Sequence, residues 1–310
     1  MRKKVVLLFS GQGAQKIGMG KDLAEAFPVA RALFDQADAA LGKPLSNLMF
    51  EGPMDELTRT SRCQPALYAH GLAVWKVLQE RLPNLEVVGA AGLSLGEFTA
   101  HAAAGTFDFE TGLKLVFQRG TFMEDACNET QGSMAAMIGG TEAAVRELAA
   151  QCDVDVANLN APGQIVLSGS VEGIKAAMDG AKDKGIAKAV LLEVAGAYHS
   201  RLMKSAQDKL ADVLAHTQIG TPEVPVVCNF EARAVSGPEV IRRTLTSQVT
   251  GSVRWAESLG LLISEGHTLF LELGPKAQIA GMMRRIDKTV KTLSIEDVPS
   301  LEHAVAELTA

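Results

Sequence analysis

Short runs of apolar residues alternate along the chain with segments whose apolar residues recur at helical spacing. Val5–Phe9 and Val87–Ala91 are runs of the first kind and are predicted to be buried strands. Pro65–Leu82, Glu97–Ala104 and Phe109–Cys127 have the helical pattern. Strands that alternate with helices in this way are typical of a mostly parallel sheet covered by helices, so we expect an α/β fold.

The middle of the chain follows a different order of elements. The predicted elements are Ser133–Ile138 (strand), Thr141–Gln151 (helix), Val154–Leu159 (strand), Gln164–Ser168 (strand), Val171–Lys184 (helix) and Lys188–Val194 (strand). This βαββαβ order is the ferredoxin-like pattern. We therefore expect a small domain at 130–196, inserted between two parts of a larger domain formed by 1–129 and 197–310.

Composition and charge narrow the possible functions. The chain has 310 residues and a formal net charge of -6, which argues against a nucleic-acid binder because such proteins usually carry a basic excess. No apolar run approaches the roughly 20 residues that span a bilayer. The run that ends at Phe9 is also shorter than the roughly 7–15 residues of a signal peptide's apolar region. We expect a cytoplasmic protein with no membrane partner.

The spacing of cysteine and histidine does not support a metal site. The chain has 4 cysteines without a CxxC pair and 6 histidines without an HxxxH or HExxH pair. The cysteines are interpreted as small apolar residues rather than as reactive thiols. We therefore expect no metal in this protein.

The strongest local signal is Gly92–Gly96, which has the pattern GxSxG between a predicted strand and a predicted helix. In a nucleophile elbow, flanking glycines allow a tight turn that presents the serine hydroxyl above the sheet. The N–H groups at the start of the helix can then stabilise an anion. Ser94 is either such a nucleophile or an incidental serine in a glycine-rich turn, and the pattern alone does not decide.

A serine nucleophile needs a base, and His199 is the best candidate. It follows the last strand of the inserted segment, where the chain returns to the larger domain, and a cleft between domains is a common position for a site. The alternative is a hydrogen-bonded structural histidine. His70 and His101 fall within helical patterns and are interpreted as packed or surface residues.

Two further segments carry polar groups of interest. The loop Gly11–Gln15 follows the first strand, but Lys16 replaces the third glycine of GxGxxG, and the P-loop pattern also fails. The remaining interpretation is a tight loop whose N–H groups form half of an oxyanion hole beside Ser94. Arg119 could bind a substrate carboxylate. Composition alone instead favours a surface position with a buried stem.

Taken together, these segments resemble one family. They occur in the order found in malonyl-CoA:acyl carrier protein transacylases, and the similarity covers nearly the whole chain. The segments are Gly11–Gln15, Gln64–Leu67, Gly92–Glu97, Gln118–Met123, Asn158–Gln164, Gly196–Ser200, Gln248, Trp255 and Glu272–Pro275. The resemblance implies an α/β-hydrolase-like core with a ferredoxin-like insertion, in agreement with the pattern of elements.

The resemblance also implies roles for single residues. Ser94 is similar to the acylated nucleophile of the family and His199 to its general base. Arg119 is similar to the clamp for the free carboxylate of malonate. The backbone N–H groups of Gln12 and Leu95 are similar to the oxyanion hole.

Other residues are assigned from the same resemblance. Gln248 is similar to the residue whose main-chain carbonyl orients the histidine, in place of an acidic triad member. Residues similar to those of the pocket or the CoA side are Gln64, Met123, Asn158 and Asn160. Two positions depart from many members, because Leu93 replaces a histidine and Tyr198 a phenylalanine. The bulk of Tyr198 still favours malonyl over methylmalonyl groups.

The function implied is transfer of malonyl from malonyl-CoA to the phosphopantetheine thiol of acyl carrier protein, for fatty-acid synthesis. Such a reaction needs no cofactor, and we expect a monomer. Three alternatives remain. They are a stand-alone polyketide acyltransferase, a serine thioesterase or hydrolase, and a non-catalytic acyl-binding module.

Carrier proteins of this pathway are acidic, so docking on a chain of net charge -6 requires a local basic patch. Arg284 and Arg285 cluster with Lys288 and Lys291, in a stretch that resembles the carrier-docking region of the family. Lysines predicted to face them across the cleft are Lys182, Lys184 and Lys188. A solvated surface without a partner is the alternative for each residue.

Overall fold

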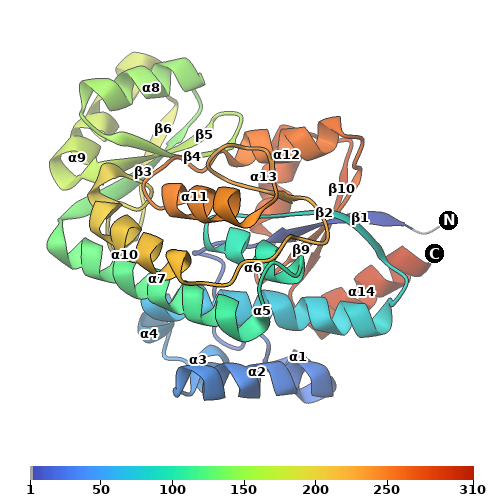
Figure 1. Cartoon of the computed structure of the whole chain (residues 1–310). Coiled ribbons are helices and arrows are strands. Elements are labelled where there is room, and N and C mark those ends of the chain that lie inside the picture. The colour runs from blue at the N-terminus through green and yellow to red at the C-terminus, as the bar shows by residue number, and fades with distance from the viewer. Residues whose placement is uncertain (1–2) are drawn as a thin grey trace.

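The computed structural model describes residues 3–310, whose strands form two sheets (Figure 1). The larger, six-stranded sheet has the order β10-β9-β1-β2-β7-β8. Its strands are β1 (Lys4–Phe9), β2 (Glu86–Gly92), β7 (Val226–Val227), β8 (Ala234–Val235), β9 (Leu269–Leu273) and β10 (Lys291–Ile295). Neighbouring strands are parallel except β7 and β8, which are antiparallel. The expected α/β fold with a mostly parallel sheet is confirmed.

Helices cover both faces of this sheet. They are α1 (Lys21–Ala26), α2 (Pro28–Leu41), α3 (Leu45–Glu51), α4 (Met54–Thr58), α5 (Thr60–Arg81), α6 (Leu95–Ala103), α7 (Phe109–Glu129), α10 (Lys204–Ala215), α11 (Pro238–Gln248), α12 (Trp255–Ser264), α13 (Gln278–Ile286) and α14 (Val298–Thr309), with a 3₁₀ turn η2 (Arg201–Met203). Leu7 and Phe9 of β1 pack in the core with α5, α6 and α7. Val6 and Leu8 point to the opposite face and pack with α12 and α13.

The smaller sheet is antiparallel and has the order β4-β5-β3-β6. Its elements are β3 (Gly132–Ile138), α8 (Glu142–Gln151), β4 (Asp155–Ala161), β5 (Gln164–Ser170), α9 (Val171–Gly180), a 3₁₀ turn η1 (Lys182–Lys184) and β6 (Lys188–Leu191). One face carries α8 and α9 over an apolar core that includes Met137 and Leu167. Along β4, main-chain hydrogen bonds join Val253 to Ala157 and Leu159 and so connect the two parts of the molecule.

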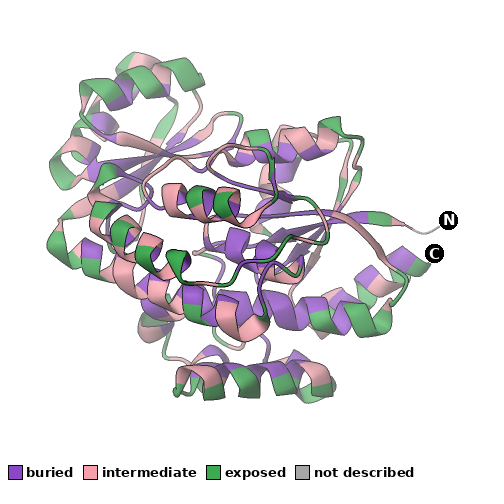
Figure 2. Cartoon of the chain, viewed as in Figure 1, coloured by how far each residue is buried: buried purple, intermediate pink, exposed green. Residues whose placement is uncertain are grey.

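Buried residues follow both sheets and the helix faces turned toward them, while the outer faces of α2 and α8 are exposed (Figure 2). Of the helices within residues 3–310, none is both long and apolar enough to cross a membrane.

Two predicted helices differ more than the others from those observed. Proline favours a first helical turn, so the sequence places a helix start at Pro65, but α5 begins at Thr60. The additional first turn lies against α7. A Cβ at Gly120 of α7 would lie 2.6 Å from the Thr60 carbonyl oxygen, so the two helices already touch at that point. The helix predicted over Val171–Lys184 ends at Gly180, and η1 continues the chain.

Candidate active site

Ser94 occupies a strained turn between β2 and α6. Its backbone has φ 55° and ψ -106°, a conformation that non-glycine residues rarely adopt. A Cβ at Gly92 would lie 1.9 Å from the Gly96 carbonyl oxygen, and one at Gly96 would lie 2.3 Å from the Phe9 carbonyl oxygen. The two glycines therefore allow the close approach that the turn requires, and the geometry is that of a nucleophile elbow.

His199 lies beside the serine. Its Nε2 is 2.8 Å from Ser94 Oγ, and its Nδ1 is 2.8 Å from the main-chain oxygen of Gln248. A carbonyl oxygen can only accept, so Nδ1 carries the hydrogen and Nε2 is left to accept the Ser94 hydroxyl. Burial, followed by the nearby charge of Arg119, lowers the pKa of His199 to about 4. The ring is therefore neutral at neutral pH, as a general base must be.

Arg119 is 1% exposed, so the surface position favoured by composition is wrong. Its Nη1 donates to Gln64 Oε1 at 2.8 Å, and its Nη2 donates to Ser94 Oγ at 3.0 Å and to Gln248 Oε1 at 2.9 Å. Burial lowers the pKa of the guanidinium to about 10, which leaves it charged at neutral pH. Among residues 3–310, its Nε has no hydrogen-bond partner, so one buried donor is left unsatisfied.

A cavity of about 670 Å³ opens above these groups, between the large sheet and the uncovered face of the small sheet. It is lined by Ser94, His199 and six further residues predicted for the site, namely Gln12, Leu95, Gln64, Met123, Asn158 and Asn160. Arg119 and Gln248 do not line the cavity and reach Ser94 from behind its wall. The structure thus brings together residues from seven separate segments of the chain.

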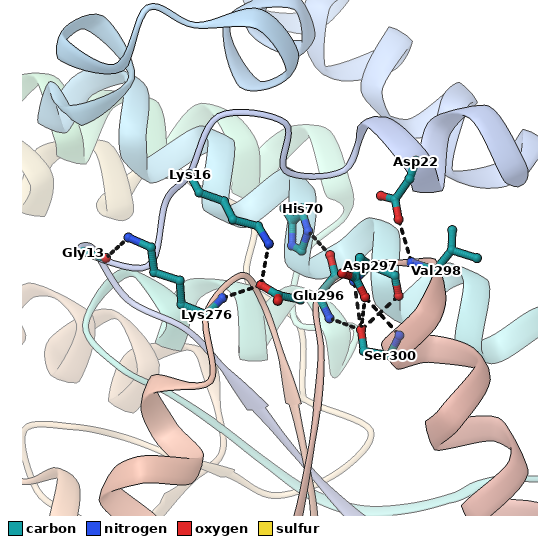
Figure 3. Close-up of polar contacts among 9 residues, drawn as sticks. All are labelled: Gly13, Lys16, Asp22, His70, Lys276, Glu296, Asp297, Val298 and Ser300. Atoms are coloured by element: carbon teal, nitrogen blue, oxygen red, sulfur yellow. Dashed lines mark hydrogen bonds and ion pairs between the residues drawn. The ribbon is translucent and has the colours of Figure 1, made fainter.

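The loop after β1 is held rigidly beside Ser94. A Cβ at Gly11 would lie 2.6 Å from the Leu93 carbonyl oxygen, so the loop packs directly on the elbow. Gly13 is fixed through its carbonyl oxygen, which accepts from Lys276 Nζ at 3.2 Å (Figure 3). The same oxygen accepts from Gln278 Nε2 at 3.0 Å. Within residues 3–310, the N–H groups of Gln12 and Leu95 donate no hydrogen bond. Two free donors beside a serine can stabilise an oxyanion.

The same loop is tied to the segment before α14. Lys16 forms a 2.9 Å ion pair with Glu296, and Glu296 also accepts the main-chain N–H of Lys276 at 2.7 Å (Figure 3). The buried ring of His70 is 2.9 Å from the Glu296 main-chain oxygen. Burial lowers the pKa of His70 to about 4, so this ring is a neutral packing residue, one of the two interpretations left by the sequence.

The two departures from the family pattern both line the cavity. The side chain of Leu93 packs over Gly11 and has no polar group, so it contributes only apolar contact to the cavity. Tyr198 is buried, and its hydroxyl is 2.5 Å from Thr60 Oγ1. This hydrogen bond fixes the position of the ring, so the aromatic wall beside His199 has limited freedom to move.

The predicted basic residues separate into two groups. Arg285 lines the cavity mouth, and Arg284 is exposed beside it on α13. Lys184 instead pairs with Glu147 of α8 at 2.7 Å, and Lys182 belongs to the same 3₁₀ turn. That turn packs against the helices of the small sheet, on the face opposite the cavity. The prediction that Lys182 and Lys184 face the cleft is therefore wrong, because the βαββαβ order places this turn in the helical layer.

Sequence reasoning missed two residues of the site. Asn229 follows β7, and its Oδ1 accepts the N–H of Ser94 at 2.7 Å while its Nδ2 donates to the Gly92 carbonyl at 2.8 Å. Glu97 of α6 is fully buried next to this asparagine. An acidic residue inside an apolar helix is a signal that could have singled out Glu97. No local pattern distinguishes Asn229.

Comparisons with known proteins agree with this site. A family model described as "Acyl transferase domain" matches residues 6–306. The malonyl CoA-acyl carrier protein transacylase of Bacillus subtilis is 40% identical, over 98% of this chain and 97% of that protein. The crystal structure of the acyl-carrier-protein-S-malonyltransferase of Bartonella henselae has a TM-score of 0.94 at 38% identity, covering 99% of this chain and 100% of that one.

A further solved structure contains a partner. It is described as a type II PKS acyl-carrier protein in complex with its malonyl-transacylase, and it has a TM-score of 0.93 at 37% identity over 98% of this chain and 100% of that one. The chain belongs to the acyl transferase family and, within it, to the malonyl CoA-acyl carrier protein transacylases.

Proposed function

We propose that this acyltransferase moves a malonyl group from malonyl-CoA to the phosphopantetheine thiol of an acyl carrier protein, through an acyl-enzyme on Ser94. The observation that carries the proposal is the 2.8 Å contact between Ser94 Oγ and His199 Nε2, with the buried charge of Arg119 only 3.0 Å from the same oxygen. The names of the relatives support the same substrates.

In the first half-reaction, Ser94 Oγ attacks the thioester carbonyl carbon while His199 Nε2 takes the hydroxyl proton. The new C–O bond places a negative charge on the carbonyl oxygen, which the N–H groups of Gln12 and Leu95 bind. The C–S bond then breaks, and CoA leaves as a thiol with the proton from His199. The Gln248 carbonyl accepts Nδ1–H from both the neutral and the protonated ring of His199, and so keeps the ring oriented throughout.

In the second half-reaction, the carrier thiol repeats these steps in reverse. It attacks the Ser94 ester, gives its proton to His199, and leaves with the malonyl group as the serine is regenerated. One thioester replaces another, so the exchange needs no metal or redox cofactor and lies near equilibrium.

Malonyl selectivity follows from Arg119. A guanidinium binds a carboxylate with two parallel hydrogen bonds. In Arg119 the two donors would be Nε, which has no partner within the described residues, and Nη2, which would exchange its hydrogen bond to Ser94 Oγ for one to the carboxylate. The malonyl carboxylate then compensates a buried charge that otherwise has only neutral hydrogen-bond acceptors. Further contacts to the substrate come from the cavity residues Gln64, Met123, Asn158 and Asn160.

The carrier docks at the cavity mouth in this proposal. Arg285 lines the mouth, and Arg284 is exposed next to it, so an acidic carrier would meet positive charge where its phosphopantetheine enters. The polyketide carrier bound to one structural relative supports a carrier protein as partner and keeps polyketide synthesis as an alternative pathway to fatty-acid synthesis.

The finer fold assignment belongs to the same proposal. The strand order β4-β5-β3-β6, with α8 and α9 on one face, supports a ferredoxin-like domain at 130–196. The parallel sheet with an elbow at Ser94 supports an α/β-hydrolase-like domain formed by 1–129 and 197–310.

Intact-mass measurement tests the function directly. The protein is incubated with malonyl-CoA, and we expect a malonyl adduct that persists and then moves to carrier protein when this is added. An adduct that is lost to water without carrier would instead identify a thioesterase. No adduct under any condition would leave a binding module.

A further inference from the structure

Glu97 is a carboxylic acid in the interior of the protein, within the first turn of α6 and next to the elbow. Burial raises the pKa of its carboxyl to about 7, against the opposing effect of two hydrogen bonds and the charge of Arg119. A buried carboxyl costs free energy unless donors satisfy its oxygens. Glu97 takes part in no step of the proposed reaction, so its contribution to the site must be sought in its contacts.

Both donors to Glu97 belong to residues of the site. Its Oε2 accepts from Gln248 Nε2 at 2.7 Å and from the main-chain N–H of Asn229 at 2.8 Å. Gln248 Nε2 also donates to the Ser94 carbonyl oxygen at 2.9 Å, while Gln248 Oε1 accepts from Arg119 at 2.9 Å. The Gln248 amide is therefore held in one orientation, with acceptors around its nitrogen and a donor at its oxygen.

These two partners reach the reacting pair from opposite sides. Gln248 accepts Nδ1–H of His199 on its main-chain oxygen at 2.8 Å. Asn229 accepts the N–H of Ser94 on its side chain at 2.7 Å. One carboxyl oxygen thus connects the residue that orients the base with the residue that holds the elbow.

We propose that Glu97 is a positioning residue, whose Oε2 holds Gln248 and Asn229 so that His199 and Ser94 remain aligned for acyl transfer. The inference rests on the proposed function of Ser94 and His199. In other serine enzymes an acidic group orients the histidine by direct contact. Here the buried carboxyl of Glu97 would orient His199 indirectly, through two hydrogen bonds that both involve Gln248.

The required property is a hydrogen-bond acceptor rather than a negative charge. Within residues 3–310, Glu97 Oε1 has no partner, so a proton can reside there while Oε2 continues to accept. The titratable groups around the carboxyl are Arg119 of α7 and Cys228 after β7. A glutamine can present an oxygen at the Oε2 position and its NH₂ at the Oε1 position, so Glu97→Gln should retain the alignment.

The test compares Glu97→Gln with Glu97→Met, which has similar size and no acceptor. The rate constant of Ser94 malonylation is measured per folded molecule at saturating malonyl-CoA, by rapid quenching and intact mass. We expect Glu97→Met to lose about 10- to 100-fold in kcat with KM little changed, because misalignment of reacting groups costs a factor of this order. Glu97→Gln should stay within a few-fold of wild type.

A double-mutant cycle distinguishes positioning from a merely structural role. Gln248→Met removes the same link from the other side and keeps the main-chain oxygen that accepts from His199. If Glu97 acts through Gln248, the loss in the double variant is smaller than the product of the single losses. Gln248→Met also tests the link if Glu97→Met does not fold. Thr99→Val is the matched control, because it removes a buried hydroxyl of α6 that has no partner within residues 3–310.

Each outcome bears on the proposal. Wild-type kcat in folded Glu97→Met, equal losses in the Gln and Met variants, or losses that multiply in the cycle would each overturn it. A wild-type protein that forms no malonyl adduct would instead refute the proposed function and leave the position of Glu97 unexplained.

Discussion

The floor of the cavity and its rim differ in how their side chains are held. At the floor and directly behind it, the side chains of His199, Arg119 and Gln248 are buried, and each makes hydrogen bonds to other fixed groups. At the rim, Met282 is half-buried and Arg285 is exposed, and Arg285 forms no ion pair within the described residues. The floor is ordered before any ligand arrives, whereas the rim is free to adjust.

This difference predicts which kinetic quantity each region controls. Groups fixed within hydrogen-bond distance of Ser94 act on the chemical step, since their stabilisation applies to the transition state. Exposed charges at the rim act mainly on the rate of association with a partner. They remain exposed to solvent in the complex, where screening weakens their contribution to affinity. Substitutions at the floor should therefore change kcat, and those at the rim should change KM for the carrier.

The largest effect is expected for the reacting pair itself. Ser94→Ala should abolish malonyl adduct formation, and His199→Ala should lose a similar share of the rate, on the order of 10³-fold or more, because the two act as a unit. Intact mass measures the adduct. Ser168→Ala, which removes a buried hydroxyl in the small sheet, is the control. Wild-type adduct levels on Ser94→Ala protein would remove Ser94 from the mechanism.

The next largest effect concerns the choice of substrate. Arg119→Ala should lower kcat/KM for malonyl-CoA, and the corresponding loss of transition-state stabilisation is about 2–5 kcal/mol, the cost of leaving a carboxylate buried and unpaired. Acetyl-CoA has no carboxylate and should lose less. The measurement is the ratio of the two specificity constants in variant and wild type. An unchanged ratio would mean that Arg119 supports the site without recognising the acyl group.

The surroundings of His199 also determine the acid limb, that is, the pH below which the rate of acylation falls. The unperturbed histidine pKa of about 6.5 predicts a loss of rate near that pH, but burial and Arg119 lower the pKa of His199 to about 4. A base must be neutral, so acylation should stay constant down to about pH 5 and then fall tenfold per pH unit below about pH 4. Stopped-flow acylation across this range measures the limb, and Arg119→Ala should move it upward. A wild-type limb near pH 6.5 would contradict the buried environment of His199.

The sequence predicted the floor in part, and the reason differs between residues. The GxSxG spacing predicted the elbow because Gly92 and Gly96 are neighbours of Ser94, so the required close contacts are local. The pairing of Ser94 with His199 joins residues 105 positions apart. The position of His199 after the inserted segment made it a candidate, and the resemblance to a family favoured it over a structural histidine. The burial of Arg119 was missed because nothing within α7 indicates the contacts that enclose it. Asn229 lies 135 residues from Ser94 and left no local signal at all.

The fold was predicted more fully because apolar periodicity is local. The apolar run Val5–Phe9 and the βαββαβ order each arise from nearby residues, and both appear in the structure. The starts and ends of helices were less accurate. The first turn of α5 lies against Gly120 of α7, a contact that no periodicity within α5 can indicate.

The smallest effect is expected at the rim. Arg284→Glu combined with Arg285→Glu should raise KM for an acidic carrier several-fold and flatten the salt dependence of transfer, because rim charges act mainly on association. Acylation by malonyl-CoA in the absence of carrier should stay near the wild-type rate. The measurements are transfer rates against carrier concentration at two or more ionic strengths.

A matched control variant separates the effect of a local basic patch from the effect of the overall net charge of the protein. Lys175→Glu with Lys182→Glu changes the net charge by the same amount, but both lysines belong to the helical layer of the small sheet, opposite the cavity. If docking depends on a local patch, this pair should leave KM and its salt response unchanged. Equal effects of the two double variants would mean that the carrier senses only the overall charge. A wild-type response in Arg284→Glu/Arg285→Glu would place the docking surface elsewhere, because only charges at the contact alter encounter after long-range attraction is screened.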